Sequence, residues 1–229
     1  MPTTFQLPDL RILTPLRGIA ALWVVVYHYG HQYLPALQPA QSGQLVEKGY
    51  LAVDLFFMLS GFVLTHVYHR DFVRFDPGRY REFLAARIAR LYPLHLLVLL
   101  AFVATAILGR MLDFALNGRF ETLPLEGAHS VLALLANLLM LQGLAAGELS
   151  WNYPAWSISV EFFAYLLFPL ALGPIWRAGR RRIVLIGLVL AAGVLGFAWF
   201  ARGDFNQWDG PLALARCLPE FLLGALLYT

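Results

Sequence analysis

Charged residues and cysteine are scarce in this chain. Aspartate, glutamate, lysine and arginine together make up only 14% of its 229 residues, whereas hydrophobic residues make up 59%. A soluble domain of this length needs more polar side chains to cover its surface, so the composition excludes an ordinary soluble protein. The single cysteine, Cys217, excludes an intramolecular disulfide and any cysteine-based metal cluster.

Lysine is nearly absent: only one of the 17 basic residues is lysine, and the other 16 are arginine. The arginines gather in two connections between apolar runs, 69–90 and 175–182, whereas the connections 31–48, 110–128 and 202–211 are neutral or slightly acidic. By the positive-inside rule, we expect the arginine-rich connections and the N-terminus in the cytoplasm. The net charge of +3 thus reflects arginines that flank the membrane, and no nucleic-acid partner is expected.

Several apolar runs approach the roughly 20 residues that a helix needs to cross a bilayer. We predict an all-α, polytopic transmembrane bundle with six or seven membrane segments, which forms a single domain over residues 1–229. We expect this domain to lie in the inner (cytoplasmic) membrane. The first run lacks a signal-peptide cleavage site and is expected to remain as a span. The last run ends without a polar tail, so we expect later spans to be missing. The runs are 12–30, 49–68, 91–109, 129–146, 156–174, 183–201 and 212–228.

The run at 129–146 conflicts with the charge pattern. If it crossed fully, the alternation of spans would place the arginines of 177–182 outside, against the positive-inside rule. The run also contains Asn137, Gln142 and several small residues, which favour spanning only weakly. We therefore expect 129–146 to be re-entrant or partly crossing, a structure tolerated where it is buried in protein or lines a cavity.

Residues 77–91 have a helical pattern of their own. Pro77 suits the first turn of a helix and an apolar stripe follows it, so we expect an interfacial helix that ends where Pro93 redirects the chain. Some histidines lie three residues apart, but no carboxylate or thiolate lies near them at the spacing that metal ligands have in a sequence. We therefore expect no metal site. Four histidines near span ends are expected at the membrane interface: His66, His69, His95 and His129.

The first apolar run, RGIAALWVVVYH, carries two side chains that are costly in lipid, Arg17 and His28. Their spacing makes about three helical turns, so both side chains lie on one helix face, about 16 Å apart along the axis. That face offers a permanent cation near one membrane surface and a titratable base deeper inside. It suits a reaction whose substrates arrive from different depths, although a proton relay is equally open.

Two arginines, Arg87 and Arg90, are neighbours on one helix face just before a span. Paired guanidinium groups suit phosphate oxygens, and the expected cytoplasmic location is where phosphorylated cofactors are found. The alternative is that both arginines anchor lipid head groups and set the topology.

Glu161 lies in WSISVEFFAYLLFP, at the start of an apolar run. At the depth of His28, its carboxylate would orient and stabilise an imidazole that acts as a general base. The alternative is a structural ion pair with an arginine such as Arg216. Trp156 and Ser157 begin the same segment, and Trp156 is also typical of a membrane interface.

Asp54 and Ser60 lie in VDLFFMLSGF, where Gly61 allows close approach of another helix. Asp54 alternatively marks the interface, and Ser60 alternatively bonds its own helix backbone. Glu220, next to Pro219, either lines the same cavity or caps a helix.

Four segments in order, RGIAALWVVVYH, VDLFFMLSGFVL, RIARLYPLH and WSISVEFFAYLLFP, resemble the membrane-bound acyltransferase 3 family, and the closing RCLPEFLLGALL resembles a later stretch of it. The resemblance implies polytopic enzymes that acylate cell-surface glycans and related molecules. It also implies roles for matching residues. These are catalysis by His28 and Glu161, donor binding by Arg17, Arg87 and Arg90, and acceptor binding by Asp54, Ser60, Trp156 and Ser157.

The expected function is therefore transfer of an acyl group, most simply acetyl, from cytoplasmic acyl-coenzyme A to a hydroxyl of a cell-surface or lipid-linked glycan. The expected partners are membrane lipids and this acceptor, while the oligomeric state stays open. A polytopic transporter with an intramembrane proton relay is the rival. A non-catalytic scaffold does not explain why the costly polar side chains sit within spans.

Overall fold

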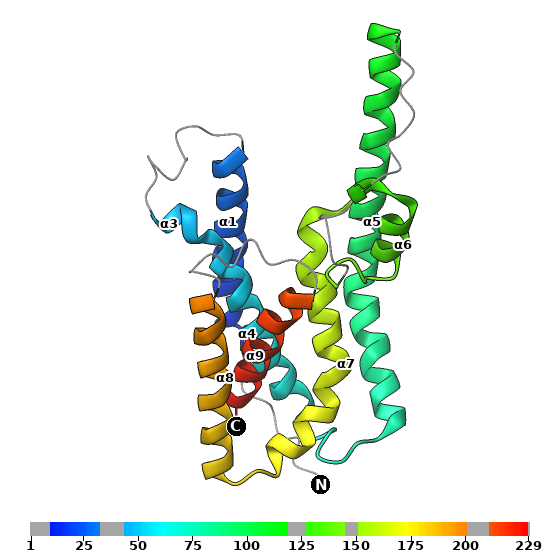
Figure 1. Ribbon diagram of the computed structural model, residues 1–229. Helices are drawn as coiled ribbons and strands as arrows, with labels where there is room; N and C mark the ends of the chain where they lie inside the picture. Colours follow the sequence, from blue (N-terminus) through cyan, green and yellow to red (C-terminus); the bar gives the residue numbers. More distant parts are fainter. Residues whose placement is uncertain (1–9, 33–43, 119–126, 145–150, 201–210, 229) are drawn as a thin grey trace. The chain divides into compact units, whose positions relative to one another are not determined.

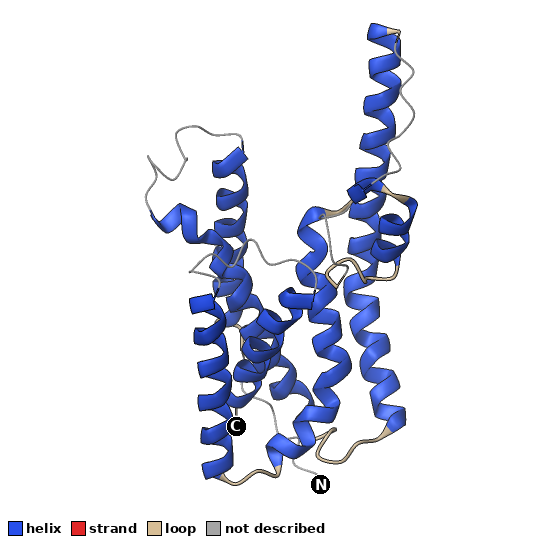
Figure 2. Cartoon of the chain, viewed as in Figure 1, coloured by secondary structure: helices blue, strands red, loops and turns tan. Residues whose placement is uncertain are grey.

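The structure is a computed structural model that describes residues 10–32, 44–118, 127–144, 151–200 and 211–228. Throughout these ranges every regular element is a helix, which confirms the all-α prediction (Figure 2). Figure 1 labels the α-helices. The elements are α1 (Leu13–Gln32), α3 (Gln44–Glu47), η2 (Lys48–Tyr50), α4 (Leu51–Tyr68), α5 (Pro77–Asn117), η3 (Gly127–His129), α6 (Val131–Leu138), η4 (Tyr153–Ala155), α7 (Trp156–Trp176), α8 (Arg180–Phe200) and α9 (Pro211–Leu227).

The chain divides into two compact units, which are described separately below. The first unit holds the residues up to Phe75, the end of α7 with α8, and α9 from Arg216 onward. The second unit holds Asp76–Pro169 and the first turn of α9. The prediction of one domain over 1–229 stays a prediction.

In the first unit, α1 packs against the segment that leads into α4. Trp23 donates its indole N–H to the carbonyl of Leu45 at 2.7 Å. A Cβ at Gly49 would stand 2.5 Å from the Cβ of Tyr27, so this close approach requires glycine. The Arg17–His28 helix is thereby fixed against the start of α4.

In the second unit, α5 is one continuous helix of 41 residues. It begins where the sequence predicts, with Pro77 in the first turn and the Asp76 side chain accepting the N–H of Arg79 at 2.7 Å. The prediction that Pro93 ends an interfacial helix is wrong, because α5 continues through it. A proline removes one backbone hydrogen bond, and in apolar surroundings the remaining ones still favour a helix over exposed backbone.

The run at 129–146 does not form a spanning helix in its described part. Its helix α6 has only 8 residues, about 12 Å, and the backbone then turns back through Met140, whose φ is +56°. This agrees with the expectation of a re-entrant or partly crossing segment.

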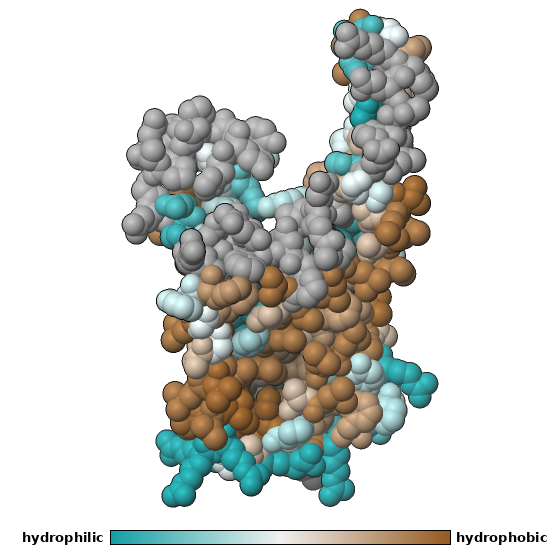
Figure 3. Space-filling view, viewed as in Figure 1, coloured by the Kyte–Doolittle hydropathy of each residue, from teal (hydrophilic) through white to brown (hydrophobic). Residues whose placement is uncertain are grey.

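Four helical segments of the described part are long and apolar enough to cross a membrane: Leu45–Tyr68, Pro77–Asn117, Tyr153–Trp176 and Arg180–Phe200. In α8 none of the most apolar stretch is buried inside the protein, as expected for a helix whose sides face lipid. Hydrophilic atoms gather at the arginine-rich end of α8, below a hydrophobic surface (Figure 3). For α1, with 20 residues, and α9, with 17, spanning stays a prediction.

Candidate functional site

The predicted site residues lie on four helices, and these residues are divided between the two units. Arg17 and His28 lie on α1 and Asp54 and Ser60 on α4, all in the first unit. The second unit holds the others, which lie on α5 and α7: Arg87, Arg90, Trp156, Ser157 and Glu161.

Arg17 and His28 are both half-buried on α1, as their spacing predicts. The His28 ring stands edge-on to the ring of Tyr27, with 5.2 Å between their centroids. Tyr27 in turn packs against Tyr50, just before α4, at 5.9 Å. The imidazole therefore packs against an aromatic ring that connects α1 to the start of α4.

Asp54 forms a two-pronged ion pair with Arg216 of α9. Arg216 donates from Nε to one carboxylate oxygen at 2.5 Å and from Nη2 to the other at 2.8 Å. The guanidinium is only 3% exposed and also lies over the ring of Tyr50 at 6.0 Å. This pair was not predicted, because the sequence alone suggested Glu161 as the partner of Arg216.

A second carboxylate, Glu220, lies one helical turn after Arg216 and is 4% exposed. Asp54 and Arg216 are the charged groups that act on it. Its Oε2 atom is buried and receives no hydrogen bond from the described residues. Two acids and one arginine thus form a buried cluster between α4 and α9.

Two glycines bring α4 and α9 into direct backbone contact beside this cluster. A Cβ at Gly61 would collide with the carbonyl oxygen of Phe221, and one at Gly224 would collide with the carbonyl oxygen of Met58. The contact is reciprocal, since each helix presents a glycine to the other's backbone. Ser60 is buried at this crossing, with 7% of its surface exposed.

At the start of α7, Trp156 and Ser157 are half-buried, and the Ser157 hydroxyl donates to the carbonyl of Pro154 at 3.3 Å. Glu161 accepts a hydrogen bond of 2.6 Å from the hydroxyl of Tyr165, one turn later. The carboxylate is thus oriented by its own helix.

Ser159, to which the sequence assigned no role, connects α7 to the turn after α6. Its hydroxyl donates to the carbonyl of Met140 at 2.6 Å and accepts the N–H of Gly143 at 3.1 Å. Gln142 donates to the carbonyl of Ala155 at 3.0 Å. The irregular backbone of the turn is therefore satisfied by α7, as a re-entrant segment requires.

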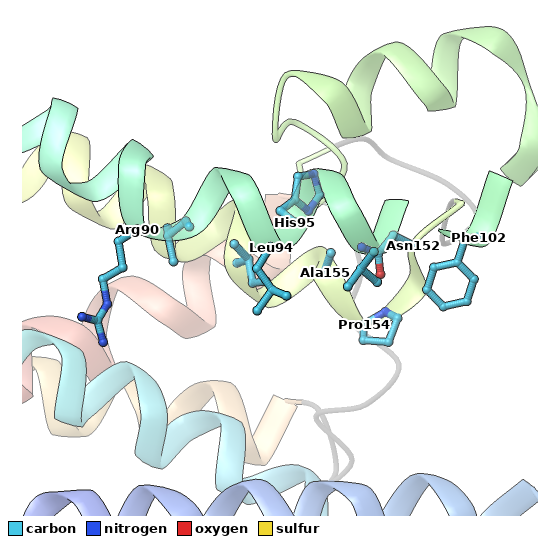
Figure 4. A pocket seen from close by; sticks show the side chains of 10 residues that line it. Arg90, Leu94, His95, Phe102, Asn152, Pro154 and Ala155 are labelled. Carbon is cyan, nitrogen blue, oxygen red and sulfur yellow. The ribbon is translucent and has the colours of Figure 1, made fainter. Parts of the chain in front are cut away.

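Arg87 lies over the ring of Phe83 at 5.8 Å, and Arg90 is exposed. Arg90 stands at one end of a pocket of about 330 Å³ between α5 and the start of α7 (Figure 4). Only three of the residues that line this pocket are polar: Arg90, His95 and Asn152.

Three histidines that were expected at the membrane interface, His66, His69 and His95, are buried inside the protein, at 5%, 8% and 2% exposure, and their depth in the membrane stays a prediction. His95 donates its Nε2–H to the carbonyl of Asn137 at 2.8 Å, so it is buried against the re-entrant segment. His69 stacks near Trp176 at 4.8 Å. His129 is exposed. In the described residues, no three histidine, cysteine or acidic side chains stand close enough to hold a metal ion.

Comparison with known proteins places the chain in a family. A family model described as an acyltransferase domain matches residues 13–229. The chain is 33% identical over 196 residues to the acyltransferase MdmB of Streptomyces mycarofaciens, covering 85% of this chain and 46% of that protein. It is 34% identical over 199 residues to protein 2 of the picA locus of Rhizobium radiobacter, covering 80% of this chain and 91% of that protein.

More distant relatives include a protein named as an O-acetyltransferase in Staphylococcus aureus strain COL, 24% identical over 210 residues. The match covers 85% of this chain but 31% of that protein, so the chain spans less than half of two of these three relatives. No solved structure matches the chain significantly. The motifs, the helical membrane architecture and the family match over residues 13–229 agree, and the chain belongs to the acyltransferase 3 family.

Proposed function

We propose that this protein transfers an acyl group, most simply acetyl, from acyl-coenzyme A to a hydroxyl of a cell-surface or lipid-linked glycan. Family membership supports acyl transfer, and the name of the S. aureus relatives supports an oxygen acceptor. We place the protein in the inner membrane with its N-terminus in the cytoplasm, because the arginine-rich connections then lie inside.

The observation that carries the proposal is the arrangement of Arg17 and His28 on α1. Both are half-buried on one helix, about 16 Å apart along its axis. A cation near one surface suits the phosphates of a donor, while a base farther along suits an acceptor hydroxyl. Arg87 and Arg90 would assist in binding the donor phosphates.

In the proposed reaction, His28 removes the proton of the acceptor hydroxyl as its oxygen attacks the thioester carbonyl carbon. The new C–O bond forms, the C–S bond breaks, and His28 returns the proton to the departing thiolate. Glu161 would stabilise the imidazolium, and its bond from Tyr165 would hold the carboxylate in place. The acceptor would bind near Asp54, Ser60, Trp156 and Ser157.

The test is acyl transfer by this chain in membranes, with labelled acetyl-coenzyme A and candidate acceptor sugars. We expect His28→Ala to abolish O-acetyl product while its membrane insertion is unchanged. His129→Ala is the matched control, because His129 is exposed and its ring meets the ring of Trp151 edge-on, with 5.0 Å between their centroids. Normal product from His28→Ala would exclude His28 as the base. Transport of label without any product would instead support a transporter.

A further inference from the structure

The packing of the first unit joins two arginine-rich segments that lie far apart in the chain. Phe72 and Val73, in the connection that follows α4, meet α7 at Gly173, where a Cβ would stand 3.0 Å and 3.2 Å from their carbonyl oxygens. Arg177 donates from Nε to the carbonyl of Gly173 at 3.2 Å, and its Nη2 atom lies 3.7 Å from the same Cβ position. The contact therefore sets the connection after α4 beside the turn between α7 and α8.

Five arginines lie on the two segments at this contact, and all five are exposed. None of them forms an ion pair with the described residues. The sequence has no acid between Glu161 and Asp204, and Asp71, in the other segment, is half-buried. Among the described residues, the positive charge at this contact is therefore largely uncompensated. We name these residues the arginine patch: Arg74, Arg177, Arg180, Arg181 and Arg182.

An uncovered apolar surface continues from the arginine patch along α8. Val184, Leu185 and Leu188 are 54%, 61% and 63% exposed, and none of the most apolar stretch of the helix is buried inside the protein. Trp176, just before Arg177, is 36% exposed, as is typical of an aromatic ring at a membrane interface. In Figure 3, hydrophilic atoms lie at the arginine-rich end of α8, below hydrophobic ones. Together these features suit a molecule with an anionic head and hydrocarbon chains.

We propose that the arginine patch binds the head groups of anionic phospholipids, whose acyl chains lie along α8. This inference does not depend on the proposed acyl transfer. A guanidinium group donates two parallel hydrogen bonds to a phosphate, and clustered arginines at a membrane surface attract anionic lipids. Successive helix residues point about 100° apart, so Arg180, Arg181 and Arg182 contact head groups on different sides of α8. The phosphates of coenzyme A have the same chemistry, but coenzyme A has no hydrocarbon chains to cover the apolar surface of α8.

The experiment titrates the purified protein in detergent with phosphatidylglycerol, cardiolipin or phosphatidylcholine, and native mass spectrometry measures the bound lipid. We expect the two anionic lipids to bind at least about tenfold more tightly than phosphatidylcholine. The double variant Arg181→Gln with Arg182→Gln should bind phosphatidylglycerol about thirtyfold more weakly, because each arginine near an anionic head group contributes about fivefold. Its affinity for phosphatidylcholine should not change.

The matched control is Arg79→Gln with Arg81→Gln, which removes the same charge from exposed positions near the start of α5. Arg79 lies 3.9 Å from Glu82, and Arg81 donates to the carbonyl of Pro77 at 3.4 Å, so this control should change lipid affinity less than about threefold. Arg181→Lys with Arg182→Lys keeps the charge and should keep most of the affinity. Melting temperatures in detergent verify folding.

A further measurement needs no variant. Raising the salt concentration from about 0.1 M to about 1 M shortens the range of electrostatic attraction from about 10 Å to about 3 Å. The unchanged protein should then bind phosphatidylglycerol at least about tenfold more weakly, while its affinity for phosphatidylcholine stays the same.

Three results would overturn this inference. The first is equal affinity of the unchanged protein for phosphatidylglycerol and phosphatidylcholine. The second is an unchanged affinity for phosphatidylglycerol in the double glutamine variant. The third concerns labelled acetyl-coenzyme A, whose binding should be the same in that variant. If the variant lost acetyl-coenzyme A and kept its lipids, the arginine patch would bind the phosphates of a soluble donor instead of a lipid.

Discussion

Arg216 illustrates how a single residue makes buried charge tolerable in this protein. Its guanidinium donates to both oxygens of Asp54, so neither charge is left alone. In lipid or protein interior, a buried charge without a partner is far more costly than a paired one. The same residue reaches the carbonyl of Tyr50 at 3.4 Å, which extends the network to the start of α4.

We expect Arg216→Met to lower the stability of the protein by about 3–5 kcal/mol, because it leaves the Asp54 carboxylate buried and unpaired. The double change Asp54→Leu with Arg216→Met should recover much of that loss. Thermal unfolding in detergent, followed by tryptophan fluorescence, measures both.

The control for this prediction is Arg79→Met. Arg79 lies 3.9 Å from Glu82, but the two side chains are 60% and 74% exposed, so their ion pair should contribute less than about 1 kcal/mol. If Arg216→Met and Arg79→Met melted at the same temperature, the Asp54–Arg216 pair would not hold α4 and α9 together.

From the sequence, an ion pair of Arg216 is only the alternative to a catalytic role for Glu161, whereas the structure pairs Arg216 with Asp54. Helix spacing predicts neighbours within one helix, whereas Asp54 and Arg216 are 162 residues apart and meet only through packing. The sequence assigns no role to Ser159 for a related reason. Its role depends on the two backbone groups of the turn after α6 that its hydroxyl contacts.

At the scale of elements, the crossing of α4 and α9 depends on glycine more than on any large side chain. Gly61 was expected to allow close approach, and the structure supplies the partner, with Gly224 reciprocating from α9. Close backbone contact strengthens van der Waals packing, which is the main attraction between helices where water is absent.

We expect Gly61→Ala and Gly224→Ala each to destabilise the protein by about 1–3 kcal/mol, because the added methyl group would force the two helices apart. Gly193→Ala on α8 is the matched control, since its Cβ would meet no atom within 4 Å. Alanine favours a helix more than glycine does, so this control should be neutral or slightly stabilising. The midpoints of thermal unfolding of the three variants measure these effects. If Gly61→Ala stabilised the protein, α4 and α9 would not cross in direct backbone contact.

The limits of sequence reasoning about elements are clearest around α5 and α6. The start of α5 was predictable, because Asp76 and Pro77 act locally. Its passage through Pro93 was not, since proline is a breaker in water and is tolerated in apolar surroundings. The burial of His95 follows from the return of the chain after α6, a tertiary contact without a local signal.

At the scale of the whole molecule, the distribution of the arginines is the basis of the proposed topology. Composition and charge were enough to predict a helical membrane protein, because both depend on the solvent rather than on particular contacts. The charge pattern also predicted that 129–146 does not cross, which the 8-residue length of α6 supports.

This topology gives a direct prediction. In a Cys217→Ala background, a membrane-impermeant maleimide should label Arg181→Cys only from the cytoplasmic side and Asn117→Cys only from the outer side. Both positions are exposed, and the native cysteine is buried. If segment 129–146 crossed fully, the two cysteines would react from the same side, and mass spectrometry of the labelled protein distinguishes these results.

The separation of Asp54 and Arg216 along the chain has a consequence for synthesis. At about 5–20 residues per second, the ribosome needs about 8–30 s to make the 162 residues between them. Throughout that interval α4 enters the bilayer with an acid that has not yet met its cation. The nascent protein must therefore shelter Asp54 in the insertion machinery until α9 arrives and completes the first unit.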